Sequence, residues 1–124
     1  DEAEQRLLER FAIINVWRPI GAPVLSTPLA LCDAQSMAES DLLPSDLVYR
    51  DKVGETFSVK ANPAHRWYYY PLLRPDEVLL LKIHDSRSDV ARRSAHTAFD
   101  DPTTPVDAPL RRSIEVRALV FFGE

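Results

Sequence analysis

The stretch Ser113-Ile-Glu-Val-Arg-Ala-Leu-Val-Phe-Phe122, close to the end of the chain, decides the fold class. It is rich in β-branched and aromatic residues, which fit a pleated, half-buried surface. Side chains alternate between the two faces of a strand. One predicted face carries Ile114, Val116, Ala118, Val120 and Phe122, and the other carries Ser113, Glu115, Arg117, Leu119 and Phe121. The sequence therefore predicts a long final strand.

Shorter segments of the same character precede it. Phe11-Ala-Ile-Ile-Asn-Val-Trp17 is apolar on both faces, so we expect a strand covered on both sides and ended by Pro19. Further strands are expected at 28–32, 46–49, 55–60, 66–70, 77–83 and 96–99. We expect a helix at 2–9, a polar connection at 33–45 and a helical turn within 86–94. Seven or eight short strands with proline-rich connections predict an all-β sandwich or barrel.

Length and composition exclude several classes of protein. The 124 residues fit one domain, and no apolar run approaches the ~20 residues that span a bilayer. The net charge of -4 argues against binding to nucleic acid, which needs a basic face. Cys32 is the only cysteine, so we expect a reducing, cytoplasmic compartment. Because the chain starts at Asp1, we expect a processed product or a piece of a longer protein.

Arg117 stands in the middle of the final strand, among large apolar residues. A guanidinium there must reach solvent or find an anion, because burying its charge alone is costly. One interpretation is a solvated outer face or an ion pair with Glu115. The other is an anchor inside a barrel for a ligand carboxylate, whose two oxygens fit the planar guanidinium.

Other chemistry-bearing residues form no complete motif. His65, His84 and His96 make no His-x-His or His-x-Asp pair, so no full metal site is visible. Cys32 lies in an apolar strand without a base nearby in sequence, which favours a core thiol over a nucleophile. The aromatic stretch at 65–70 fits either a core or the wall of a small-molecule pocket.

Several residue strings, taken in their order, carry a resemblance that spacing alone does not. They are Asn15-Val-Trp-Arg-Pro19, Pro28-Leu-Ala-Leu-Cys-Asp33, Asn62-Pro63, His65-Arg-Trp-Tyr-Tyr69, Asp76-Glu-Val-Leu-Leu80, Asp85-Ser86, His96-Thr-Ala-Phe99, Asp101-Pro102 and Ser113-Ile-Glu-Val-Arg117. Together they resemble the hydroxylase/desaturase family of fungal secondary metabolism, across residues 5 to 122. That family includes aspergillic-acid hydroxylase-like, cephalosporin methoxylase-like and gibberellin desaturase-like proteins.

The resemblance implies a mainly β fold with a double-stranded β-helix (jelly-roll) core and a short N-terminal helix. It also implies a non-haem Fe(II), 2-oxoglutarate-dependent hydroxylase or desaturase that oxidises a small natural product. Such enzymes hold iron on two histidines and one carboxylate. Carried over by residue, His96 resembles the distal iron ligand, with His65 as its rival, and Arg117 resembles the 2-oxoglutarate anchor, with Arg111 as its competitor.

The resemblance further implies that Trp17 and Arg18 line the co-substrate side, and that His65, Trp67 and Tyr69 line the substrate side. The family's His-x-Asp pair precedes the Asn15–Pro19 string, but no histidine precedes it here. We therefore expect residues 1–124 to form a single domain that resembles the C-terminal half of the fold, with an incomplete jelly roll.

Three functional readings stay open at this point. The chain is part of an oxygenase, or a non-catalytic β-domain that binds a small molecule or a partner subunit. A cupin-like isomerase or lyase is the third, but it needs a metal cluster that three widely spaced histidines do not provide. We expect no nucleic acid or membrane partner. An exposed sheet edge would favour a homodimer.

Overall fold

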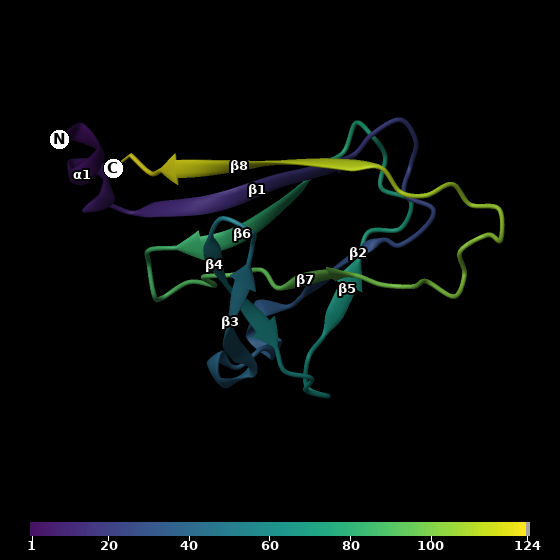
Figure 1. The fold of residues 1–124 in the computed structure, drawn as a ribbon, viewed down its shortest axis with the longest axis horizontal. Helices are drawn as coiled ribbons and strands as arrows, with labels where there is room; N and C mark the ends of the chain where they lie inside the picture. Colours follow the sequence, from purple (N-terminus) through teal and green to yellow (C-terminus); the bar gives the residue numbers. More distant parts are fainter. Residues whose placement is uncertain (124) are drawn as a thin grey trace.

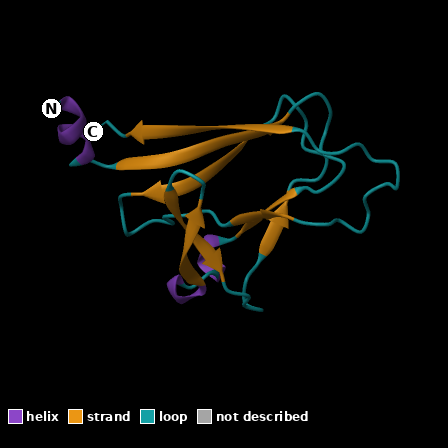
Figure 2. Ribbon diagram, viewed as in Figure 1, coloured by secondary structure: helices purple, strands orange, loops and turns teal. Residues whose placement is uncertain are grey.

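The computed structural model describes residues 1–123 and is mainly β (Figure 2). Helix α1 spans Glu2–Leu7, and two 3₁₀ turns span Ala34–Ser36 and Glu39–Asp41. The strands are β1 (Phe11–Pro19), β2 (Leu29–Cys32), β3 (Leu42–Val48), β4 (Val53–Val59), β5 (Trp67–Tyr69), β6 (Leu79–Asp85), β7 (His96–Ala98) and β8 (Ser113–Phe121). Eight strands and one short N-terminal helix confirm the predicted class.

Six of these strands form two layers (Figure 1). One sheet has the order β6-β1-β8 and the other has the order β5-β2-β7, with every neighbouring pair antiparallel. Among the described residues, the outer strands β6, β8, β5 and β7 therefore each have one edge without a strand partner. The β3–β4 hairpin forms a separate two-stranded sheet.

The hydrophobic core lies between the two layers. Trp17 and Leu81 from the first sheet pack with Val24 and Leu73 from the connections. The partly buried residues around them are Leu29, Leu31, Leu79 and Ile83. Leu29 and Leu31 belong to β2, so this cluster joins the two sheets. The face of the first sheet that carries Trp17 and Leu81 therefore points toward the second sheet.

The register of β1 explains how its two faces are used. Asn15 pairs with Arg117 on one side and with Leu81 on the other, so all three share the inner face. Arg18 lies on the opposite face and is exposed. We expected residues 11–17 to be covered on both sides, and each of them is buried or partly buried, whereas Arg18, beyond that stretch, reaches solvent.

Two local expectations are wrong. Residues 42–45, expected as a connection, belong to β3, because Pro44 is tolerated in a hairpin that no third strand joins. Residues 86–94, expected to hold a helical turn, form no helix. This segment is held to β6 instead: the Arg87 amide donates to Asp85 Oδ1 at 3.1 Å, and the Ser94 amide donates to the Lys82 carbonyl at 2.7 Å.

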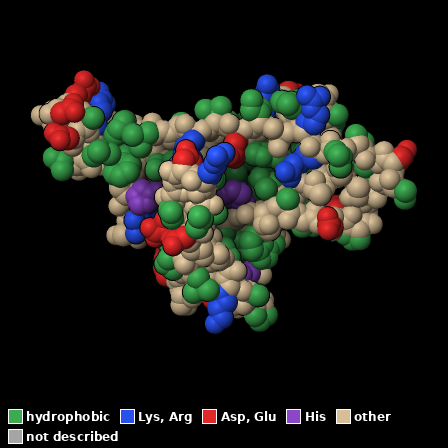
Figure 3. Space-filling view, in the orientation of Figure 1, with side chains coloured by type: hydrophobic (Ala, Val, Ile, Leu, Met, Phe, Trp, Pro, Cys, Tyr) green, Lys and Arg blue, Asp and Glu red, His purple; other side chains and the backbone are tan. Residues whose placement is uncertain are grey.

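Hydrophobic side chains also reach the outer surface of the first sheet, along the upper edge of Figure 3 over β8. Ile114 and Val116 on β8 and Leu80 on β6 are all more than half exposed. No helix among the described residues is long and apolar enough to cross a membrane.

Candidate functional site

His96 begins β7 and pairs with Leu31 of β2, so its ring lies on the face of the second sheet that meets the core. Its Nδ1 lies 2.8 Å from the Ser94 carbonyl oxygen. A carbonyl can only accept, so Nδ1 donates, and Nε2 is the nitrogen that carries the lone pair when the ring is neutral. Histidines that bind metals are usually held by this kind of second hydrogen bond. The ring is therefore prepared for a metal through Nε2.

Arg117 projects from the facing sheet. Its Nε donates to Asn15 Oδ1 at 3.0 Å, and Asn15 Nδ2 donates to Glu115 Oε2 at 3.4 Å. Asn15 is buried, whereas Arg117 is exposed. Among the described residues Arg117 forms no ion pair, so the expected pair with Glu115 is replaced by a bridge through Asn15. Both the arginine and the histidine thus lie on inner faces.

Arg111 contacts Trp17, which shares the inner face of the first sheet with Arg117. The Arg111 guanidinium stacks over the Trp17 ring at 5.4 Å, and its Nη1 donates to the Thr27 carbonyl. Trp17 is buried in the core. Arg18 points the other way, and its Nη1 donates to the Pro75 carbonyl at 3.0 Å. The structure therefore brings Trp17 and Arg111 together but places Arg18 on the outer face.

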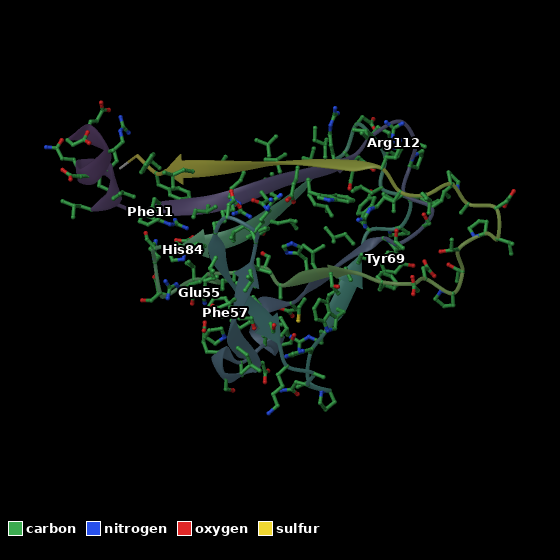
Figure 4. The ribbon with its side chains drawn as sticks, in the orientation of Figure 1. Phe11, Glu55, Phe57, Tyr69, His84 and Arg112 are labelled. Atoms are coloured by element: carbon green, nitrogen blue, oxygen red, sulfur yellow. The ribbon has the colours of Figure 1, made fainter. Side chains whose placement is uncertain are left out.

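The aromatic strand β5 divides its side chains between the two faces. Tyr68 pairs with Leu31 and so shares the face of His96, whereas Trp67 and Tyr69 pair with Cys32 and Ala30 on the opposite face. Figure 4 shows Tyr69 at the end of β5, where its ring packs edge-on against Phe99 at 5.1 Å. The structure therefore does not place Trp67 and Tyr69 beside His96.

Cys32 is buried at the end of β2. Its Sγ lies 3.5 Å from Ser36 Oγ and 3.7 Å from the Asp33 carbonyl oxygen. These are weak contacts for a thiol and include no base. This environment agrees with the interpretation of a core thiol.

A cavity of about 420 Å³ opens where β2 ends and β7 begins. Its walls come from the β3–β4 hairpin, from the two 3₁₀ turns and from the segment 88–95, with His96 in the lining. Among the described residues, no three His, Cys, Asp or Glu side chains gather as a metal site. His96 is thus a lone candidate ligand beside a pocket.

His65 does not line the cavity. It stabilises the open end of the β3–β4 hairpin, where β3 begins and β4 ends. Its Nε2 lies 2.9 Å from Asp41 Oδ2, and Asn62 Nδ2 donates to the same oxygen at 3.1 Å. The Asp41 carbonyl also accepts from the Lys60 amide at 2.7 Å, which closes the hairpin. Both the His65 and the Asp41 side chains are less than a tenth exposed. His65 is therefore engaged in a buried hydrogen-bond network.

This network predicts that the protein loses stability in acid. The hydrogen bond from His65, helped by Asn62, lowers the pKa of Asp41 below its ordinary value of 3.8. A lowered pKa in the folded state means that the carboxylate stabilises the fold above about pH 4 and that this contribution is lost as pH falls further. We expect the thermal midpoint of the Asp41→Asn variant to fall less between pH 5 and pH 3 than that of the wild type, by about 5 °C.

The matched control is Asp46→Asn, because Asp46 is an exposed carboxylate on the same hairpin. It should keep the pH dependence of the wild type. Equal slopes for the Asp41→Asn variant and the wild type would contradict the role of Asp41.

Sequence reasoning missed the residues that shape the cavity. Phe57 comes from β4 and Arg93 from the segment expected to form a helical turn. The Arg93 guanidinium lies 4.8 Å from the centre of the Phe57 ring. No local pattern links two residues 36 positions apart, so only a three-dimensional structure could find this pair.

Comparisons with known proteins assign the chain to a family. A family model described as an oxidoreductase/YMDC permease-like domain matches residues 1–121. The chain belongs to this family. Aspirochlorine biosynthesis protein N of Aspergillus oryzae is 44% identical over 98% of this chain and 52% of its own length. An Fe(II)/2-oxoglutarate-dependent dioxygenase of Aspergillus novofumigatus is 43% identical over 99% of this chain and 45% of its own length.

A solved structure agrees with these oxidoreductase relatives. An iron and alpha-ketoglutarate-dependent endoperoxidase matches with a TM-score of 0.90 and 41% identity, over all of this chain and 47% of its own. The resemblance to hydroxylases and desaturases of fungal secondary metabolism is therefore confirmed, as is the jelly-roll fold. The chain spans about half the length of the curated relatives it matches.

Proposed function

We propose that this chain is the C-terminal, single-domain part of an Fe(II)/2-oxoglutarate-dependent oxygenase that hydroxylates or desaturates a small natural product. The observation that carries the proposal is the hydrogen bond from His96 Nδ1 to the Ser94 carbonyl at 2.8 Å, which leaves Nε2 free for iron. Iron is proposed as the cofactor and 2-oxoglutarate as the co-substrate because the names of two relatives include them.

Each residue has a defined part in this proposal. His96 holds the iron through Nε2, and iron when bound supplies the oxidising power. Arg117 binds the distal carboxylate of 2-oxoglutarate through the Nη groups, because Asn15 already engages Nε and fixes the orientation of the guanidinium. Trp17 and Arg111 line the co-substrate side in this proposal, with the Arg111 guanidinium over the Trp17 ring.

Within residues 1–123 the other two ligands of a facial triad are not gathered around His96. Iron held by one histidine binds weakly, because the protein supplies only one of the three ligands that such sites use. We therefore propose that catalysis needs ligands beyond those that these residues bring together.

The test is anaerobic Fe(II) titration of the chain, followed by NMR of the histidine rings. We expect the ring protons of His96 to broaden first, while those of His65 stay sharp because its Nε2 is bound to Asp41. His84 is the internal control, since it lies on β6 of the first sheet and its ring packs on Phe11, with 5.7 Å between the ring centroids (Figure 4). His96→Gln should remove the early broadening, and His84→Gln should preserve it.

Equal broadening of all three histidines would reject His96 as the iron ligand. A non-catalytic β-domain is the alternative, favoured by the unpaired edges of β7 and β8. A homodimer in light scattering, with the β8 amides protected from hydrogen exchange and no Fe(II) response at His96, would support that alternative.

A further inference from the structure

The cavity beside His96 is basic although the whole chain is acidic. Its lining includes three basic residues, Lys82, Arg92 and Arg93, and one acidic residue, Glu39, whereas the net charge of the protein is -4. Apolar side chains make up much of the remaining wall, among them Met37, Leu42, Phe57, Val59 and Val90. A pocket of this composition suits an apolar molecule with a negatively charged group.

Two of the three basic side chains are already engaged by the protein. Lys82 Nζ donates to Asp85 Oδ2 at 2.8 Å and to the Ala91 carbonyl at 3.1 Å. Arg92 Nε donates to the Asp85 carbonyl at 3.1 Å. Asp85 is fully buried, so these contacts fix the side chains of Lys82 and Arg92 to the protein interior.

Arg93 is held differently. Its guanidinium stacks on Phe57, and its Nη1 lies 3.2 Å and 3.4 Å from the two carboxylate oxygens of Glu39. The Glu39 side chain is 79% exposed, while that of Arg93 is 25% exposed. An ion pair whose acid faces water contributes little, because solvent competes for the carboxylate. Glu39 is therefore a partner that another anion can replace.

We propose that this cavity binds an aromatic or polycyclic molecule that carries one anionic group, and that Arg93 selects that group by exchanging Glu39 for it. The Arg93 guanidinium lies 4.8 Å from the centre of the Phe57 ring, and both residues line the cavity, so an aromatic anion there can meet the ring and the guanidinium together. A volume of about 420 Å³ accommodates a small natural product. Identifying this molecule as the enzyme's substrate rests on the proposed function, but binding itself does not.

The test uses two fluorescent probes and the metal-free chain. One is 8-anilinonaphthalene-1-sulfonate, and the other is N-phenyl-1-naphthylamine, which has the same rings without the sulfonate. We expect Arg93→Gln to weaken binding of the sulfonate probe roughly tenfold and to leave the neutral probe nearly unchanged. We expect Glu39→Gln to strengthen sulfonate binding about threefold, because the internal competitor is gone.

Two control variants keep the result specific. Arg87→Gln removes an exposed arginine of the same segment, which pairs with Asp89 outside the cavity lining. Val116→Lys alters the exposed apolar face of β8, where a hydrophobic probe could also bind. Neither should change sulfonate binding by more than about twofold.

The proposal is overturned if Arg93→Gln weakens both probes equally, or no more than Arg87→Gln does. It is also overturned if Glu39→Gln weakens sulfonate binding, or if Val116→Lys is the only variant that changes the affinity for the sulfonate probe. Because Glu39 is exposed, its variant should fold even if Arg93→Gln does not. No iron is present, so failure here leaves the Fe(II) test of His96 untouched, and the reverse also holds.

Discussion

Replacing Asp85 with asparagine is expected to lower the midpoint of thermal unfolding by roughly 10 °C or more. Asp85 is fully buried, and its carboxylate accepts from Arg10 at 2.9 Å and 3.3 Å and from Lys82 at 2.8 Å. The Arg87 amide donates to it as well. Removing the charge leaves two cations without their buried anion, which is costly even when the shape of the side chain is kept.

The position of Asp85 explains why the loss should be global. Arg10 stands at the start of β1 and also stacks over the Phe122 ring at 4.1 Å, next to the end of β8. Lys82 lies on β6, and Arg87 begins the segment that leads to the cavity. One carboxylate therefore links β6 with Arg10, which precedes β1 and contacts Phe122, and with the segment that leads to the pocket. The hydrogen bonds from Arg10 and Lys82 hold the pKa of Asp85 well below its ordinary value.

The measurement is calorimetry of Asp85→Asn beside Asp89→Asn. Asp89 also pairs with an arginine, Arg87, but both side chains are largely exposed. Exposed ion pairs contribute little, so Asp89→Asn should move the midpoint by no more than about 2 °C. Similar midpoints for the two variants would show that the Asp85 network does not hold the fold together.

Shortening Leu81 to alanine should destabilise the protein by about 3 kcal/mol. Leu81 is fully buried in the core, where it meets Trp17 and the partly buried leucines of β2. Both sheets and the connections around Val24 and Leu73 close on this side chain, so the cavity left by its methyl groups cannot collapse easily.

Leu80→Ala is the matched control, because Leu80 is the neighbouring residue on β6 but points outward and is 64% exposed. Urea unfolding should show a change below about 0.5 kcal/mol for Leu80→Ala. Comparable losses for both variants would mean that the two faces of β6 are not distinguished as the register indicates.

The faces of β1 and β8 could be predicted because alternation in an extended chain is a local property. Trp17 and Arg117 follow that rule without help from the rest of the fold. The bounds of β3 could not be predicted in the same way. Pro44 looks like a strand breaker in sequence, and it is accepted because, within residues 1–123, the hairpin pairs with no third strand.

The candidate site shows the same division. His96 and Arg117 were predicted because their neighbours match family strings, whereas the orientation of the His96 ring depends on the Ser94 carbonyl. Trp67, Tyr68 and Tyr69 are all aromatic, and only the pairing of β5 with β2 tells which of them shares the face of His96. Arg93 had no sequence signal, because its partners lie on the hairpin and in a 3₁₀ turn.

The sequence by itself determined that the chain is β-rich, which residues alternate along each strand, and to which proteins it is related. Those features depend on residues close together in the chain. The tertiary structure alone decided that Asp85 is buried between two cations, that Asn15 rather than Glu115 holds Arg117, and that a basic pocket opens beside His96. These depend on contacts between distant segments, and the free energy of such contacts exists only after the sheets have packed.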